Sequence, residues 1–201
     1  MTFALLPAAG KSSRMGRPKL ALPLRGVTVL ECTVTALRQA GADPVLVVLG
    51  PQVPELAPLA RRAGALVLQL PAETPDMRAT VEAGLDWLEG QYRPAPEAGW
   101  LLCPADHPVL DPAVVRQLVE ARDANPGRSV FIPTWNGRRG HPTLLAWHHV
   151  GPMRALPAGL GLNAYLRQQG AVTAEVPVSS PGVLYDLDTP ADYERLRAGG
   201  D

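Results

Sequence analysis

Near its N-terminus the chain reads Leu5-Leu6-Pro7-Ala8-Ala9-Gly10-Lys11-Ser12-Ser13-Arg14-Met15-Gly16-Arg17-Pro18-Lys19, a short apolar run followed by a turn of small and basic residues. The small residues of the turn are Ala8, Ala9 and Gly10. They let the backbone come close to a ligand, so that its N–H groups can donate to phosphate oxygens. The cationic residues that can supply the counter-charge are Lys11, Arg14, Arg17 and Lys19. The stretch therefore predicts a loop that holds a triphosphate.

Two well-known phosphate motifs are excluded in this loop. A Walker A loop needs a glycine five residues before Gly10, where Leu5 stands, and the dinucleotide fingerprint Gly-x-Gly-x-x-Gly is absent. A glycine followed by scattered basic residues is also typical of a solvated surface loop. The full string, however, resembles the signature L-A-A-G-x-S-x-R-M-G-x-x-K of the MobA-like nucleotidyltransferases, closest to the molybdenum cofactor cytidylyltransferase branch. Pro7 departs from it, because that family often has Leu there.

Length, charge and cysteine content restrict the class of protein. The chain has 201 residues, which fits one domain, and its 19 basic and 19 acidic side chains cancel, so no overall positive field attracts nucleic acid. Cys32 and Cys103 are isolated, which argues against a disulfide framework and against a zinc site. No apolar run is long enough to cross a membrane, and no charged leader precedes Lys11. We expect a cytoplasmic protein without nucleic-acid or membrane partners.

Short apolar runs alternate with helical patterns along the first two thirds of the chain. The expected strands are residues 2–6, 44–49, 65–70, 100–103 and 129–132, and the expected helices are residues 29–40, 77–88 and 114–124. This alternation predicts an α/β fold, a doubly wound, mostly parallel Rossmann-like sheet with helices on both faces. The family resemblance implies the nucleotide-diphospho-sugar transferase-like form of that fold. Gly41, Asp111-Pro112 and Thr189-Pro190 give helix-end signals that agree with it.

The pattern becomes less regular after residue 133. We expect a turn at 135–140, a strand at 142–147 and a helix at 160–169, which together form an insertion that faces the second substrate. Residues 172–178 and 183–187 then return to the sheet as strands, and residues 190–198 form a last helix. We interpret residues 1–201 as a single MobA-like domain, with a nucleotide-binding half over about 1–110 and an acceptor-binding region over about 111–185.

Asp106 is the first acidic residue that can carry chemistry. It follows an expected strand in Pro104-Ala105-Asp106-His107-Pro108, and so lies on the same rim as the basic loop. Magnesium binds one or two carboxylates together with phosphate oxygens and water, although an Asp in a proline-rich turn is more often a turn former or a cap. The segment resembles the family's D-M-P or D-Q-P metal motif, with His107 in the middle position. That resemblance implies that Asp106 is a metal ligand.

A second acidic element lies near the C-terminus. Tyr185-Asp186-Leu187-Asp188-Thr189-Pro190-Ala191-Asp192 resembles the family's D-I-D-T-P-E-D signature. In an extended chain Asp186 and Asp188 point the same way. We choose Asp188 as the second Mg²⁺ ligand and keep Asp186 as the alternative. Thr189 is interpreted as a helix cap, and Asp192 as a carboxylate that favours the helix dipole.

Two further segments resemble the family's substrate pockets. Residues 136–142, Asn-Gly-Arg-Arg-Gly-His-Pro, resemble G-x-R-G-H-P, which implies acceptor binding by Arg138, Arg139, Gly140 and His141. Without the resemblance this segment is a basic hairpin turn or a phosphate site, and His141 is expected to fix the turn rather than to act as a base. Residues 77–85 resemble the base-pocket segment G-M-x-x-S-x-x-x-G-L, with Asp76 in place of glycine and Thr80 in place of serine.

One departure from the family affects the acceptor side. The family's G-D-x-G-A-R becomes Ala158-Gly159-Leu160-Gly161-Leu162-Asn163, so an acid and an arginine are both lost. The adjacent His148 and His149 face different directions on a helix, which argues against a zinc site. The acceptor is therefore less well defined by the sequence than the nucleotide.

The motifs together predict a magnesium-dependent nucleotidyltransferase. An acceptor phosphate attacks the α-phosphorus of a nucleoside triphosphate and pyrophosphate leaves, so catalysis consists of positioning and charge neutralisation. The predicted nucleotide-binding residues are Ala8, Ala9, Gly10, Lys11, Lys19 and Thr80, and the predicted catalytic residues are Lys11, Arg14, Lys19 and Asp106. The resemblance implies CTP and a molybdopterin acceptor. The alternatives are a GTP-dependent enzyme acting on the same cofactor, a sugar- or alcohol-phosphate nucleotidyltransferase, and a non-catalytic protein that delivers cofactor to a molybdoenzyme client.

Overall fold

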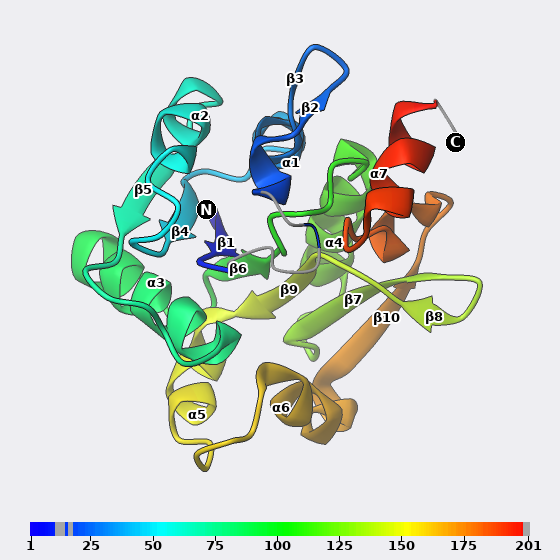
Figure 1. The fold of residues 1–201 in the computed structure, drawn as a ribbon. Coiled ribbons are helices and arrows are strands. Elements are labelled where there is room, and N and C mark those ends of the chain that lie inside the picture. The colour runs from blue at the N-terminus through cyan, green and yellow to red at the C-terminus, as the bar shows by residue number, and fades with distance from the viewer. Residues whose placement is uncertain (11–14, 16–17, 199–201) are drawn as a thin grey trace.

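A mixed, mostly parallel sheet runs through the centre of the molecule, with helices on both faces (Figure 1). The computed structural model describes residues 1–10, 15 and 18–198. From one edge to the other, the strands of the sheet are β10 (Thr173–Pro177), β7 (Val130–Trp135), β9 (Thr143–Ala146), β6 (Gly99–Leu102), β1 (Thr2–Ala8), β4 (Val45–Leu49) and β5 (Leu66–Gln69). The predicted α/β class is confirmed.

The pairing of the strands explains where the sheet changes direction. The pairs β1 with β4, β1 with β6, β4 with β5 and β7 with β10 are parallel, whereas β9 lies antiparallel between β6 and β7. A short strand β8 (Arg138–Arg139) pairs with β7. After β1 the chain builds β4 and β5 on one side and then crosses to β6 on the other. The carboxyl ends of β1 and β6 therefore form the switch point, where α/β sheets bind ligands.

The central strand β1 divides its side chains between two hydrophobic cores. Ala4 and Leu6 pack into one core, while Phe3 and Leu5 pack into the other. All four are at most 1% exposed, so the strand is apolar on both faces, as a parallel strand covered on both sides must be. This is why the run reads as continuously apolar rather than alternating.

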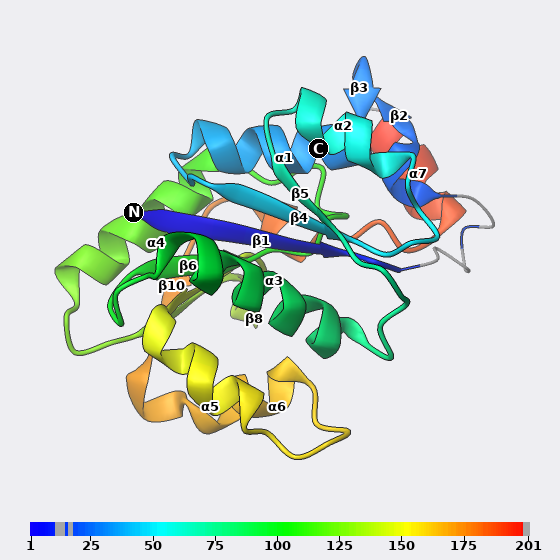
Figure 2. The same cartoon turned by 90° about the vertical axis from the view of Figure 1, so that its left-hand side faces the viewer.

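The helices divide in the same way, as Figure 2 shows. The first core is covered by α1 (Val29–Gln39), α2 (Leu56–Arg62), α4 (Pro112–Ala124) and α7 (Pro190–Arg197). The second core is covered by α3 (Met77–Tyr92), α5 (Val150–Arg154) and α6 (Leu162–Gln168). Among the described residues, no helix is long and apolar enough to cross a membrane.

Local sequence signals fix the helix ends. Asp111 caps α4 with Pro112 at its first position, and Thr189 caps α7 in a capping box with Asp192. Gly41, with φ +90°, follows α1 in the left-handed region that glycine adopts without strain. Each of these predicted helix ends is confirmed. Asp192 was expected only to interact favourably with the helix dipole, but its carboxylate also accepts a hydrogen bond from the backbone N–H of Thr189.

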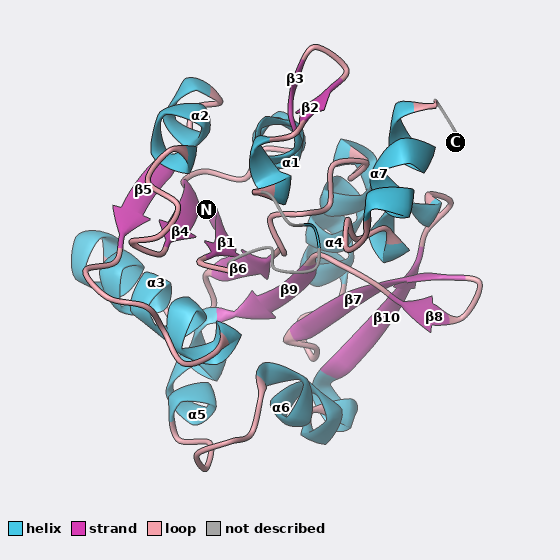
Figure 3. Cartoon of the chain, in the orientation of Figure 1, coloured by secondary structure: helices cyan, strands magenta, loops and turns pink. Residues whose placement is uncertain are grey.

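The structure differs from the expected elements in several places, which include α5, β8 within the expected turn at 135–140, and β9, which lies inside the central sheet rather than in an insertion. Helix α2 was not predicted, nor was the hairpin of β2 (Pro23–Leu24) and β3 (Val27–Thr28), which stands apart from the main sheet in Figure 3. The predicted strand at 183–187 is wrong. The chain forms a 3₁₀ helix η5 (Pro181–Leu184) there, because the Val183 carbonyl accepts from His141 N at 2.8 Å instead of joining a strand ladder.

Candidate functional site

A cavity of about 470 Å³ opens at the switch point of the sheet. Its walls include the end of β1 at residues 7–10, the segment after β6 at residues 104–106, and the start of α3. This volume is in the range of small-molecule sites. The predicted nucleotide-binding residues that line it are Ala8, Ala9, Gly10, Lys19 and Thr80. Lys11 and Arg14, which the sequence also assigns to the nucleotide, lie outside the described residues, as does Arg17.

At Gly10 the described wall of the cavity leaves room for a ligand. A Cβ built on Gly10 would have no atom of the described residues within 4 Å, so these residues leave the wall open beside its backbone. Ala8 is 4% exposed and closes the end of β1 against the first core. The backbone beyond it is therefore accessible to a ligand in the cavity.

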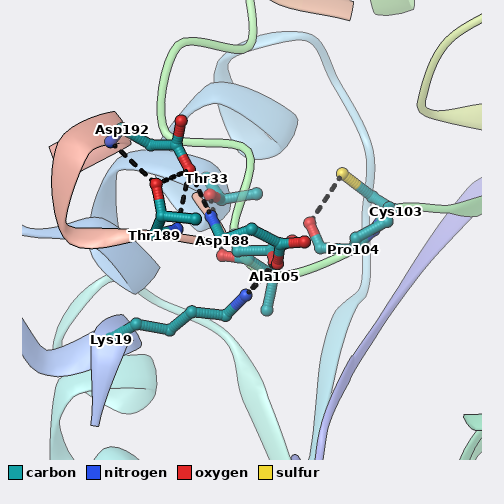
Figure 4. A network of polar contacts seen from close by, with 9 residues as sticks. Lys19, Thr33, Cys103, Pro104, Ala105, Asp188, Thr189 and Asp192 are labelled. Carbon is teal, nitrogen blue, oxygen red and sulfur yellow. Dashed lines mark hydrogen bonds and ion pairs between the residues drawn. The ribbon is translucent and has the colours of Figure 1, made fainter. Parts of the chain in front are cut away.

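Lys19 lies between the two carboxylates that the sequence assigned to the metal. Its Nζ is 2.5 Å from Asp106 Oδ2 and 3.1 Å from Asp188 Oδ1, and all three residues line the cavity. Figure 4 shows the Lys19 side chain directed at Asp188. Burial by itself would lower the pKa of Lys19, but the hydrogen bonds and charges of Asp106 and Asp188 outweigh it and raise that pKa above its ordinary value. The ammonium group therefore stays charged between the two carboxylates.

Short backbone contacts hold the two carboxylates in place. The Thr33 hydroxyl of α1 donates to the Ala105 carbonyl at 3.1 Å, which fixes the turn before Asp106. The Leu187 N–H donates to the Asp106 carbonyl at 3.1 Å, which joins the two acidic segments directly. Asp188 N in turn donates to Asp192 Oδ2 at 3.2 Å, at the start of α7. The two segments, distant in sequence, are thus held together by main-chain bonds.

These geometries distinguish Asp188 from its alternative. Asp188 contacts Lys19 and lines the cavity, whereas Asp186 is exposed and is absent from the described lining. The charge of Asp186 instead acts on His107, whose pKa is lowered mainly by burial. Asp188 is therefore better placed than Asp186 to share a cation with Asp106.

The donor set fits a divalent cation held with a phosphate. Asp106 and Asp188 supply two carboxylates next to the cavity, and Mg²⁺ needs few protein oxygens when phosphate and water complete its shell. Among the described residues, no group of three or more His, Cys, Asp and Glu side chains converges to form an all-protein metal cage. His149 instead contacts Tyr165 Oη at 2.6 Å and Ser129 Oγ at 2.9 Å.

Thr80 contributes to the wall opposite the β1 end. The residue is 3% exposed, and its hydroxyl lies 2.6 Å from Thr74 Oγ1 and donates to the Asp76 carbonyl at 3.2 Å. Asp76 caps α3 by accepting from Ala79 N at 2.8 Å. Asp76 and Thr80, which replace the family's glycine and serine, are thus joined by a hydrogen bond. Asp76 also serves as the N-cap of α3.

The predicted acceptor residues at 138–141 lie beside the site without lining the described cavity. Arg138 and Arg139 are exposed on β8, and Arg139 Nε pairs with Glu175 at 2.8 Å. Gly140 is required by close packing, because a Cβ there would lie 2.3 Å from the Val183 carbonyl. Their role toward an acceptor stays a prediction.

His141 packs against His107. The two rings lie 5.4 Å apart at 78°, and burial lowers the pKa of His141 to about 4, so the imidazole is neutral near pH 7. His141 N also donates to the Val183 carbonyl. The backbone of His141 supports the turn, and the prediction that its ring is not a general base stays a prediction.

Gln52 is a cavity residue that the sequence reasoning did not identify. Its Nε2 donates to the Ala9 carbonyl, and its Oε1 is buried without a partner among the described residues. A signal existed, because Gln52 follows the strand expected at 44–49 and therefore lies on the same rim as Asp106. Its bond to Ala9 helps to fix the backbone of the phosphate loop.

Comparisons with known proteins identify the family of the chain. The model of the MobA-like NTP transferase domain matches residues 4–173. The phosphoenolpyruvate guanylyltransferase of Rubrobacter xylanophilus is 36% identical over 98% of this chain and 94% of that protein. The molybdenum cofactor cytidylyltransferase of Escherichia coli (strain K12) is 24% identical over 94% and 92% of the two chains.

A solved structure extends the likeness to the whole fold. Rv0371c of Mycobacterium tuberculosis H37Rv, in complex with manganese, has a TM-score of 0.74 and 28% identity over 98% of each chain. The central sheet and its helices have the nucleotide-diphospho-sugar transferase fold. A family model that covers most of the chain, together with this fold and site, establishes that the chain belongs to the MobA-like NTP transferase family of nucleotidyltransferases.

Proposed function

We propose that this protein transfers the nucleoside monophosphate of CTP to the phosphate of a molybdopterin acceptor and releases pyrophosphate. The observation that carries the proposal is the position of Lys19 between Asp106 and Asp188, 2.5 and 3.1 Å away, in the wall of a cavity that begins at Ala8. A cation and two carboxylates beside a wall of small residues suit a bound triphosphate. Their agreement with the sequence motifs supports the same conclusion.

The chemistry places few demands on the protein. The acceptor phosphate is already ionised, so its oxygen forms a bond to the α-phosphorus while the bond to the β-phosphate breaks, and pyrophosphate carries away the electron pair. No general base is required. The task of the chain is to hold two anions together and to balance the charge that moves to the leaving group.

Each group has a proposed part in this task. Asp106 and Asp188 would hold Mg²⁺, which supplies positive charge at the triphosphate when it is bound. Lys19, already charged beside both carboxylates, holds a phosphate oxygen. Lys11 and Arg14 are proposed to complete the phosphate contacts. The nucleotide base is proposed to lie toward Thr80, and the acceptor toward residues 138–141.

Phosphoenolpyruvate with GTP is a second candidate pair of substrates. Two observations favour it, namely the 36% identity to a phosphoenolpyruvate guanylyltransferase over almost both chains and the loss of the charged pair at Gly159 and Asn163. A sugar- or alcohol-phosphate acceptor would use the same site. A non-catalytic carrier for a molybdoenzyme client is less favoured, because a carrier does not need two carboxylates at the phosphates. The expected cytoplasmic location stays a prediction.

Pyrophosphate release tests these alternatives directly. The purified protein is incubated with Mg²⁺ and each of the four ribonucleoside triphosphates, together with molybdopterin, phosphoenolpyruvate, 2-C-methyl-D-erythritol 4-phosphate or no acceptor. We expect release only with CTP and molybdopterin together. Release with GTP and phosphoenolpyruvate would replace the first candidate by the second. Nucleotide binding without release in every mixture would favour the carrier.

A further inference from the structure

One arginine outside the proposed catalytic set has an unusually complete set of partners. Arg78 lies in the first turn of α3, and its side chain is 13% exposed. Its Nε donates to Glu82 Oε1 at 2.7 Å. Its two other nitrogens donate to four backbone carbonyls, those of Arg154 (3.1 Å), Leu156 (2.9 Å), Pro157 (2.9 Å) and Leu160 (3.2 Å). A guanidinium has five N–H donors, so this one is fully used.

The four carbonyls belong to one connection, residues 154–160, between α5 and α6. The last carbonyls of a short helix have no partner within the helix, and the Arg154 and Leu156 carbonyls at the end of α5 obtain theirs from Arg78. The rest of the connection is largely exposed and includes Gly159 with φ +82°. Arg78 is therefore its main polar attachment to the body of the molecule among the described contacts.

The first turn of α3, which carries Arg78, also borders the cavity. Its chain neighbour Met77 lines the cavity, as do Asp76 and Thr80. Thr80, two residues along the helix, is rotated by about 200° from Arg78, so the first turn of α3 presents one face to the cavity and another to the connection. Figure 2 shows the α5–α6 connection beneath the N-terminal end of α3.

The connection is also where the family's acid and arginine are missing, at Gly159 and Asn163. Arg78 brings a guanidinium to the same segment from a different element. It does so through main-chain carbonyls, whose positions do not depend on which side chains the connection carries. The shape of the connection is thus held although the charged pair is absent.

From these contacts we propose that Arg78 is a positioning residue, which holds the α5–α6 connection against the first turn of α3, next to the cavity residues Asp76 and Met77, so that the connection borders the acceptor site. The assignment of an acceptor to this side rests on the proposed function. Arg78 touches no reacting atom. It acts by fixing residues 154–160 relative to the first turn of α3.

The test compares Arg78→Met with Arg154→Met. Arg154 also joins the two elements, through Asp86 at 2.5 Å and Glu89 at 2.9 Å, but these partners lie further along α3, away from the cavity. Both variants lose an attachment between α3 and α5, so they are matched for a general loss of stability. We expect Arg78→Met to raise the KM for the acceptor about tenfold or more, with kcat and nucleotide Kd within about threefold of wild type, and Arg154→Met to leave the acceptor KM unchanged. Arg78→Lys should recover only part of the loss, since an ammonium cannot reach four carbonyls.

Equal acceptor KM values for Arg78→Met and wild type would overturn the proposal, as would equal increases in both methionine variants. Hydrogen exchange separates this result from a failure of the proposed function. If wild type releases no pyrophosphate with any acceptor, the proposed function fails, and the positioning role is judged by whether Arg78→Met speeds exchange at the amides of residues 155–161 while the strands keep their protection. Unchanged exchange there would refute the positioning role by itself.

Discussion

The rim at the ends of β1 and β6 and the region of residues 138–163 both use backbone hydrogen bonds, but the rim adds a cluster of charged side chains beside the cavity. At the rim, charged side chains face one another, as Lys19 does with Asp106 and Asp188. In the second region the important contacts end on backbone carbonyls, as those of His141 and Arg78 do. Changing a charge at the rim should alter the chemistry while leaving the fold intact. Changing the size of a side chain in the second region should alter packing or acceptor binding instead.

Asp106→Asn is the sharpest test of this contrast. Asparagine keeps the volume of the side chain and leaves the Asp106 carbonyl bond to Leu187 untouched, so the fold should persist. Loss of the ionised oxygen should cost about 3 kcal/mol in the barrier, or roughly 100-fold or more in kcat. Asp186→Asn is the matched control, because Asp186 is an exposed carboxylate that the described cavity lining does not include. Steady-state pyrophosphate release that fell equally in both variants would remove the distinction between the two acids.

Lys19→Met should weaken nucleotide binding by a smaller factor. In wild type, ligand at 100 times its Kd stabilises the protein by about 2.7 kcal/mol, and a tenfold weaker Kd reduces that to about 1.4 kcal/mol. The rise in Tm on adding triphosphate and Mg²⁺ should therefore shrink to about half. Arg116→Met, on the exposed surface of α4, should keep the full rise. A full rise in Lys19→Met would show that the triphosphate binds elsewhere.

Gly140→Ala probes the second region through its packing. The new Cβ would lie 2.3 Å from the Val183 carbonyl, so the turn and η5 must separate. We expect a loss of about 1–3 kcal/mol in the free energy of unfolding, measured by urea denaturation. Gly127→Ala, whose Cβ would meet no atom within 4 Å, should change it by less than about 0.5 kcal/mol. Similar stability in the two variants would contradict the close packing at Gly140.

The smallest effect is expected from restoring the family's charged pair. Gly159→Asp combined with Asn163→Arg should change the acceptor KM a few-fold and leave nucleotide affinity unchanged. Gly159 has φ +82°, so any side chain there adds some strain, and Gly159→Asn with Asn163→Gln controls for it without adding charge. Calorimetric titration of CTP and GTP, paired with turnover, measures both quantities. A change in nucleotide affinity alone would show that the two regions are not functionally separate.

Local patterns predicted much of the sheet and its helices. The apolar run of β1, the caps Asp111 and Thr189 and the stop at Gly41 each depend on chemistry within a few residues, and the structure confirms all of them. The rule that ligands bind at carboxyl ends of strands also put Asp106 on the rim of the basic loop. Lys19 and Asp106 do lie together there, although they are 87 positions apart in sequence.

The elements that sequence reasoning missed depend on partners without a sequence signature. Residues 183–187 were predicted as a strand, but Val183 lies in η5 and bonds to His141, and the Leu187 N–H bonds to the Asp106 carbonyl. Arg78 was not selected, since its partners in the α5–α6 connection are carbonyls, which every residue possesses. No pattern of side chains marks which carbonyl a donor will reach.

The sequence by itself determined most strands of the central sheet and the helices between the early ones, the helix caps, and the types of charged residue available at the rim, because apolar periodicity and capping act over a few positions. Only the tertiary structure decided that Asp188 rather than Asp186 faces Lys19, that residues 138–141 support η5, and that Arg78 holds the α5–α6 connection. These outcomes depend on which distant backbone segments come within hydrogen-bonding distance, and that distance is set by the packing of the two cores.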